Sequence, residues 1–213
     1  MAQFFTVHPD NPQDRLLKQA VAMLREGAVI ALPTDASYVL ACHLGDKAAL
    51  DRIRTIRRLD PSHLMTLLCK DLSSVGSYAK IENSTFRLLK SLMPGPFTFI
   101  LTASREVPNR LLHPKRKTIG LRIPESAICQ HLLSLLTEPL LATTLILPGE
   151  DLPLTDAEEM REKLQHHVDL IIDGGPGSLT ATTVIDATQS TPILVRQGLG
   201  HSGFPRVVNN KLE

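Results

Sequence analysis

The chain has no tryptophan, and aromatic residues make up only 4% of its 213 positions. The hydrophobic core must therefore come mainly from Val, Leu, Ile and Ala, within the 43% of residues that are hydrophobic. No window approaches the roughly 18 consecutive apolar residues that a membrane helix requires. The opening residues, MAQFFTVHPDNPQDR, lack the basic start and apolar run of a signal peptide. We expect a cytoplasmic protein with no membrane partner.

Cysteines are few as well. Cys42, Cys69 and Cys129 are odd in number, far apart and set in apolar segments, with no CxxC pair. This pattern favours buried free thiols over metal ligation, and it fits a reducing compartment.

The usual nucleotide-binding motifs are also missing. There is no GxxxxGK[ST] loop and no GxGxxG turn, and the glycine-rich stretch 174–177 is more typical of a loop than of a phosphate cradle. No Ser/His/Asp order stands out among the scattered histidines. Any phosphate chemistry would have to rest on arginine, lysine and hydroxyl groups, with Mg²⁺ shared with the substrate.

Charge is distributed unevenly although the net charge is only +1. Basic residues outnumber acidic ones over 47–70 and 105–122, whereas acidic residues dominate 150–173. Such segregation suggests that one face of the molecule attracts anions. Solvated helix surfaces and loops are the alternative explanation for each run.

Apolar periodicity switches repeatedly between helix and strand patterns. We predict helices at 13–26, from a cap at 46 onwards, at 83–93, at 125–136, and at 155–167 behind a Thr155/Glu158 capping box. We predict strands at 28–32, 38–42, 65–69, 97–102, 118–123, 140–146, 169–173, 182–186 and 192–196. Alternation throughout favours one α/β domain over 1–206, with an open twisted sheet and a short tail at 207–213.

Two arginines emerge directly from apolar strands, Arg122 in GLRIP and Arg196 in ILVRQG. A guanidinium in such a setting is costly unless it meets an anion or a carboxylate. A structural salt bridge would explain either one alone. Two of them, together with a basic helix face, favour an anionic ligand held outside the strand ends.

Five segments, in order between residues 33 and 198, resemble motifs of the YrdC/YciO family: PTDASYVL, MPGPFT, TIGLRIP, ATTVID and LVRQG. The opening QFFTVHPDNPQ resembles the YciO branch in particular. The resemblance implies a YrdC-like α/β fold, in which an open twisted sheet with flanking helices forms a concave basic groove.

The family is similar to enzymes of tRNA t6A modification that combine L-threonine, bicarbonate and ATP into threonylcarbamoyl-AMP and pyrophosphate. The resemblance therefore implies ATP or adenylate as a ligand, Mg²⁺ accompanying ATP, and L-threonine and bicarbonate as further partners. On the nucleotide side it implies Arg57, Thr118, Thr144 and Arg196. On the amino-acid side it implies Thr34, Tyr38, Arg122 and Thr182.

The chain departs from the synthase pattern at several positions. The synthases have Lys-x-Arg and Ser-x-Asn, where this chain has Arg-Arg-Leu at 57–59 and Thr-Leu-Ile at 144–146. An Asn and a His of the family are replaced by His63 and Leu68 if no gap intervenes. A hydrogen bond to a charged group contributes about 1.5–3 kcal/mol. Losing the guanidinium at Leu59 and the amide at Ile146 predicts a reaction slowed by roughly 10²–10⁴-fold if nothing compensates, that is, weak or altered adenylyl transfer.

A binding protein without catalysis is the alternative. The same basic surface would hold double-stranded RNA or tRNA through its phosphates, with few aromatics available for base stacking. The candidate RNA contacts are Arg54, Arg58, Lys115, Arg116 and Lys117.

Overall fold

The computed structural model describes residues 1–60 and 63–201. The predicted tail at 207–213 and the last residues of the predicted domain lie outside these ranges. The strands are β1 (Gln3–Thr6), β2 (Ile30–Leu32), β3 (Val39–His43), β4 (Thr66–Leu68), β5 (Phe97–Thr102), β6 (Thr118–Arg122), β7 (Leu140–Thr144), β8 (Leu170–Asp173), β9 (Thr183–Asp186) and β10 (Ile193–Arg196). The helices are α1 (Asp14–Arg25), α2 (Lys47–Arg57), α3 (Leu72–Tyr78), α4 (Asn83–Leu92), α5 (Ala127–Leu136) and α6 (Ala157–Leu164), with a 3₁₀ turn at Asn109–Leu111.

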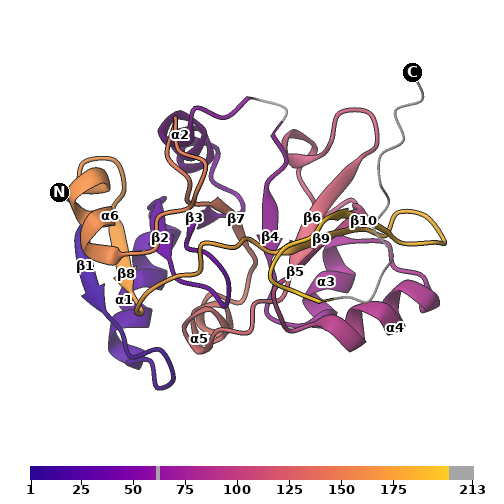
Figure 1. Cartoon of the computed structure of the whole chain (residues 1–213), viewed down its shortest axis with the longest axis horizontal. Coiled ribbons are helices and arrows are strands. Elements are labelled where there is room, and N and C mark those ends of the chain that lie inside the picture. Colours follow the sequence, from indigo (N-terminus) through magenta and orange to yellow (C-terminus); the bar gives the residue numbers. More distant parts are fainter. Residues whose placement is uncertain (61–62, 202–213) are drawn as a thin grey trace.

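All ten of these strands join one twisted sheet in the order β1-β8-β2-β3-β7-β4-β6-β5-β9-β10 (Figure 1). The sheet is mixed: β4 and β6 are parallel, as are β5 and β9, whereas β3, β7 and β4 form antiparallel pairs. Segments far apart in the sequence therefore meet in the middle of the sheet. The predicted α/β class with an open twisted sheet is confirmed.

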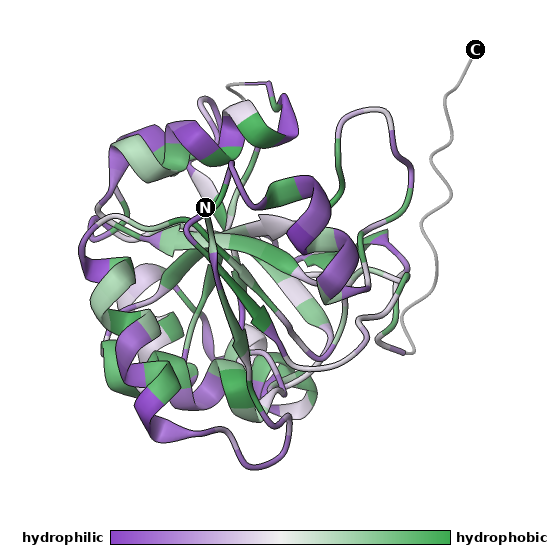
Figure 2. Cartoon of the chain, turned by 90° about the vertical axis from the view of Figure 1, so that its left-hand side faces the viewer, coloured by the Kyte–Doolittle hydropathy of each residue, from purple (hydrophilic) through white to green (hydrophobic). Residues whose placement is uncertain are grey.

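The helices cover the sheet with apolar stripes of helical period. Leu17, Val21 and Leu24 form the buried stripe of α1, and this helix packs beside α5. In Figure 2 the hydrophilic sides of the helices face outward and the hydrophobic sides face the sheet. This amphipathic pattern is what burial of one helix face requires.

Successive strand residues bury against opposite faces of the sheet. On β3, Leu40 and Cys42 belong to the core cluster that includes α2 and α6, whereas Val39 and Ala41 belong to the one that includes α1 and α5. Side chains of a strand alternate with period two, which explains why these strands are apolar without interruption.

Local differences from the predicted elements have local causes. The edge strand β1 and the helix α3 were not predicted, because β1 has only four residues and α3 is rich in serine. The cap of α6 is Asp156, whose carboxylate accepts from Glu159 N, and not Thr155; the helix ends at Leu164 before reaching 167. Pairing with a distant strand and the choice between adjacent cap residues are both decided by tertiary contacts.

The three cysteines are free and buried, as predicted. Within residues 1–60 and 63–201, no three His, Cys, Asp or Glu side chains gather as a metal site. The helices of the same ranges include none long and apolar enough to cross a membrane.

Candidate functional site

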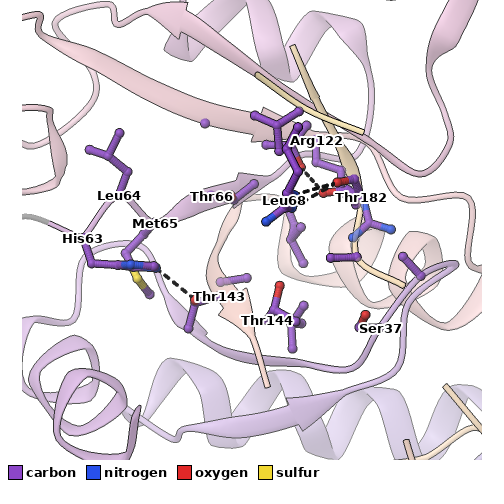
Figure 3. Close-up of a pocket in the computed structure, with 18 of the residues that line it drawn as sticks. Ser37, His63, Leu64, Met65, Thr66, Leu68, Arg122, Thr143, Thr144 and Thr182 are labelled. Atoms are coloured by element: carbon purple, nitrogen blue, oxygen red, sulfur yellow. Dashed lines mark hydrogen bonds between the residues drawn. The ribbon is translucent and has the colours of Figure 1, made fainter. Parts of the chain in front are cut away.

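A cavity of about 240 Å³ lies over one face of the central strands (Figure 3). Thr66 of β4 is the cross-strand neighbour of both Gly120 in β6 and Ala142 in β7, and Thr98 of β5 is the neighbour of Val184 in β9. Cross-strand neighbours share a face, so these five residues form a common floor. A side chain at Gly120 would approach the Thr66 hydroxyl to 3.1 Å, so the glycine keeps the space above the floor open.

Arg122, the last residue of β6, lines the cavity although its side chain is only 4% exposed. Its Nη2 donates to Asp35 Oδ1 at 2.5 Å and to Thr34 Oγ1 at 3.3 Å. Its Nε and the second carboxylate oxygen of Asp35 are buried, and neither has a hydrogen-bond partner among the described residues. The charge of Arg122 is thus compensated, while part of its donor capacity is unused.

The turn before β3 positions that carboxylate. Thr34 Oγ1 donates to Ser37 O at 2.8 Å and accepts from Ala36 N at 3.0 Å, which closes the turn around Asp35. A hydroxyl that bonds the backbone two or three residues on is a common device of tight turns. Thr34 is not part of the cavity wall, and it acts on the site by holding Asp35 against Arg122.

Arg57 enters the cavity from the end of α2. Arg58 adopts a left-handed conformation (φ 48°) and ends the helix, so Arg57 is its last residue. The Arg57 Nη1 donates to Thr143 Oγ1 at 3.3 Å and to the carbonyl oxygen of Thr144. Its Nε is buried without a partner in the described chain, and burial lowers its pKa. No carboxylate compensates this guanidinium within that part of the chain.

Arg196, the last residue of β10, is held by a main-chain carbonyl. Its Nε and Nη2 donate to Thr182 O at 3.3 and 3.0 Å, and the Thr182 hydroxyl lies 2.8 Å from that of Thr98. A side chain at Gly198 would come within 2.3 Å of Ala181 O, so glycine is required for this close approach. Partial burial lowers the pKa of Arg196.

The cavity is therefore basic. Three guanidinium groups line it, and no Asp or Glu from residues 1–60 and 63–201 does. In Figure 3, Thr143 and Thr144 lie across the cavity from Arg122 and Thr182. Convergent arginines and hydroxyls without facing carboxylates are suited to an anionic ligand.

Five of the eight predicted ligand contacts line this one cavity: Arg57, Thr144, Arg196, Arg122 and Thr182. Their individual roles remain predictions. The floor residues and Ser37 were not predicted, because only strand pairing shows that they share a face. We expected a ligand outside the strand ends; the cavity instead spreads over the face of the central strands, although its arginines do come from element ends.

Tyr38 and Thr118, like Thr34, do not line this cavity, and their roles remain predictions. Tyr38 is fully buried; its hydroxyl donates to Gly175 O at 2.7 Å and accepts from Gly174 N at 3.2 Å. Desolvation raises the pKa of Tyr38 to about 12, so the hydroxyl stays protonated. It can therefore keep donating to Gly175 O and hold the glycine-rich loop. Thr118 is 2% exposed at the opposite end of β6 from Arg122.

The departures from the synthase pattern fall in or beside the cavity. Ile146, Leu68 and His63 line it, whereas Leu59 packs against the hydrophobic core. Ile146 and Leu68 thus present apolar side chains on the wall itself.

The candidate RNA contacts lie outside the cavity. Arg58, Lys115 and Lys117 are exposed, while Arg116 is 3.3 Å from Asp186 and Arg54 is 3.5 Å from Asp51. Figure 1 places α2 and the loop 103–117 on the same side of the sheet, and Arg110 Nη2 donates to Gly45 O to join them.

The fold and the site together identify the class of protein. Residues 22–198 match the Sua5/YciO/YrdC family, which is described as "Telomere recombination". The chain belongs to this family.

Among its relatives, the chain is 51% identical to Escherichia coli (strain K12) YciO over 200 residues, covering 94% of this chain and 97% of that protein. The E. coli YciO crystal structure superposes with a TM-score of 0.92 over 95% of this chain and 98% of that one, at 50% identity.

More distant relatives carry named activities or ligands. The chain is 36% identical to bovine (Bos taurus) threonylcarbamoyl-AMP synthase over 160 residues, which are 75% of this chain and 56% of the synthase. The P. abyssi Sua5 structure complexed with L-threonine has a TM-score of 0.84 at 27% identity, covering 92% of this chain and 57% of that one. The chain thus spans little more than half of these longer relatives.

Proposed function

We propose that the cavity binds ATP or an adenylate together with a small carboxylate such as L-threonine, and that the protein has weak or altered adenylyl-transfer activity. The observation that carries this proposal is the set of three arginines lining one cavity, with no described carboxylate on its wall. Relatedness to threonylcarbamoyl-AMP synthases, and L-threonine in the related Sua5 structure, support this choice of ligands.

The three arginines differ in how their charge is balanced, which supports different ligand groups for each side of the cavity. Arg122 is already paired with Asp35, so a zwitterion that brings its own compensating amine suits that side better than a polyanion. Arg57 and Arg196 have only hydroxyl or carbonyl partners within the described chain. Uncompensated guanidinium groups suit phosphate oxygens, to which they donate in a bidentate manner.

In the proposed reaction, the amine of threonine combines with bicarbonate and loses water to give a carbamate. A carbamate oxygen attacks the α-phosphorus of ATP, and the bond to the β-phosphate breaks to release pyrophosphate. Arg57 and Arg196 would offset the charge that spreads over the phosphate oxygens, while Arg122 would orient the carboxylate. Mg²⁺ would arrive with ATP and neutralise the leaving group.

The altered wall argues for low activity with the usual substrates. Ile146 and Leu68 line the cavity without offering a hydrogen bond. By the family resemblance, the synthases have an amide at the first position and, if no gap intervenes, an imidazole at the second. An enclosed volume of about 240 Å³ lies below the roughly 300–1,000 Å³ of pockets that enclose a drug-sized ligand. A nucleotide would therefore extend out of the cavity, and small changes at its wall would alter which carboxylate fits.

Calorimetric titration tests this function. ATP with Mg²⁺ should bind, and L-threonine with bicarbonate should tighten that binding and release pyrophosphate slowly. A matched titration with AMP separates adenosine contacts from those of the outer phosphates. Absence of binding by ATP and AMP alike would overturn the proposal, whereas binding without pyrophosphate release would leave a nucleotide-binding protein that acts on another carboxylate.

A second candidate function is binding of double-stranded RNA or tRNA. It is favoured by Arg58, Lys115 and Lys117, which are exposed and make no ion pair within the described ranges. Each phosphate contact should steepen the fall of log K with log salt by about 0.7–0.9. The triple variant with alanine at these positions should lower that slope by about 2–3, and an unchanged slope would exclude this surface.

A further inference from the structure

His63 occupies the wall of the cavity on the Arg57 side. Its Nε2 lies 3.3 Å from Thr143 Oγ1 (Figure 3). The same hydroxyl accepts from Arg57 Nη1 at 3.3 Å. Imidazole, hydroxyl and guanidinium thus form one connected group beside the cavity. A backbone bond from His63 N to Asp60 O at 2.9 Å fixes the chain that carries the ring.

The charged surroundings of this imidazole are one-sided. Arg57 and Arg54 face it from α2, Thr143 faces it from β7 without charge, and Asp60 shares its loop. No Asp or Glu of the described residues lines the cavity. Burial, followed by the two arginine charges, holds the pKa of His63 below the usual 6.5, so the ring is neutral near pH 7.

We propose that His63 takes up a proton when a phosphate-bearing ligand binds beside Arg57, and that it then serves as an additional cationic donor to that ligand. This inference rests on the proposed function, because it assigns His63 to the phosphate side of the same site. It makes ligand binding in the cavity sensitive to pH.

The physical cause is the change in local charge. In the free cavity a proton on His63 would add positive charge beside Arg57, which has no carboxylate partner in the described chain, and near Arg54, which is paired with Asp51. A bound phosphate supplies negative charge at that point and stabilises the imidazolium. The proton comes from solvent and no covalent bond changes, so tighter binding at lower pH is the thermodynamic counterpart of proton uptake.

Titrations of Mg-ATP into the intact chain at pH 6.5, in two buffers of different ionisation enthalpy, measure the proton uptake. We expect about half a proton more for the wild-type protein than for His63→Gln, which keeps a polar group but does not titrate. If ligand binding raises the His63 titration midpoint by about one pH unit, the affinity for Mg-ATP should rise as the pH falls from 8 to 6. This rise should be up to about tenfold larger in the wild-type protein than in His63→Gln. Proton uptake by ATP itself is common to both proteins and cancels.

His166→Gln is the matched control, because His166 is exposed, follows α6 and does not line the cavity. It should retain the wild-type uptake. NMR titration of the His63 ring in the wild-type chain gives an independent readout, and its midpoint should rise when Mg-ATP saturates the site. Binding with equal uptake in His63→Gln, or an unmoved midpoint, overturns this inference alone. Failure of the wild type to bind Mg-ATP also overturns this inference, and failure to bind AMP as well overturns the proposed function with it.

Discussion

The arginines of the cavity differ in how their charge is balanced. Arg122 is 4% exposed and paired with Asp35, whereas Arg57 and Arg196 lie against hydroxyl and carbonyl groups with no carboxylate in the described chain. Burial lowers the pKa of both unpaired arginines. In a buried pair the two charges neutralise each other, and removing either partner destabilises the fold. An uncompensated guanidinium instead has its charge available for a ligand. The comparison separates an arginine whose charge the fold already compensates, and which keeps one unused donor, from two whose charge is uncompensated.

The largest expected effect comes from breaking the buried pair. Asp35→Asn leaves Arg122 buried without a counter-charge, and removing one partner of such a pair costs about 3–5 kcal/mol. Urea unfolding monitored by circular dichroism measures the change. Asp51→Asn is the control, because the Asp51 side chain is 46% exposed where it pairs with Lys47 and Arg54. This substitution should cost at most about 1 kcal/mol. Equal losses for the two variants would refute the distinction.

Removal of an uncompensated arginine should affect binding and leave the fold intact. Arg196→Ala deletes a charged donor that contributes about 1.5–3 kcal/mol, so the Kd for Mg-ATP should rise about 10- to 150-fold. Calorimetry gives the Kd, and the urea midpoint checks the fold. Arg25→Ala, at the exposed end of α1, should change neither quantity. Wild-type affinity in Arg196→Ala would remove this residue from the site.

A conservative change tests the geometry of the Arg122 side. Arg122→Lys retains a charge for Asp35 but loses the planar fork that holds a carboxylate in a bidentate manner. The tightening of ATP binding by L-threonine and bicarbonate should fall about tenfold, while the Kd for Mg-ATP alone stays within about twofold. If both affinities fall together, the two sides are not separate subsites.

The smallest expected effect concerns pH and stability. The pKa of His63 is lowered in the folded chain, so the unfolded chain takes up a proton at a higher pH than the folded chain does. The contribution of neutral His63 to folding stability is therefore present above pH 6.5 and is lost as the pH falls below 6.5. His63→Gln should lose less Tm than the wild-type protein between pH 7.5 and pH 5, by at most about 2 °C. Differential scanning calorimetry measures this. A larger loss in the variant would reverse the assigned direction of the shift.

Much of the fold follows from local pattern. The α1 stripe, the apolar strands and the caps at Asp46 and Ser126 are encoded within a few residues of where they act. Elements that depend on distant partners were less predictable. The strand β1 exists because it pairs with β8, more than 160 positions away, and no periodicity in its four residues distinguishes it from a loop.

The sequence predicted the chemistry of the site, a preference for anions, better than it predicted which residues line the cavity. Arg122 and Arg196 are recognisable because a guanidinium directly after an apolar strand needs an anionic or polar partner. Thr34, Tyr38 and Thr118 do not line the cavity. A resemblance gives the order of motifs but not the direction of each side chain. Thr66 and Thr98 became part of the floor only through strand pairing, which their own neighbours do not reveal.

The sequence by itself determined the α/β class, the family resemblance, the supply of arginines at the ends of elements, and the apolar residues at 68 and 146. Only the tertiary structure decided that Arg122 is paired with Asp35, and that Arg57 and Arg196 line the same cavity without a described carboxylate. The physical reason is distance along the chain. Hydrophobic period is a local property, whereas compensation of charge depends on which remote segments the sheet brings together.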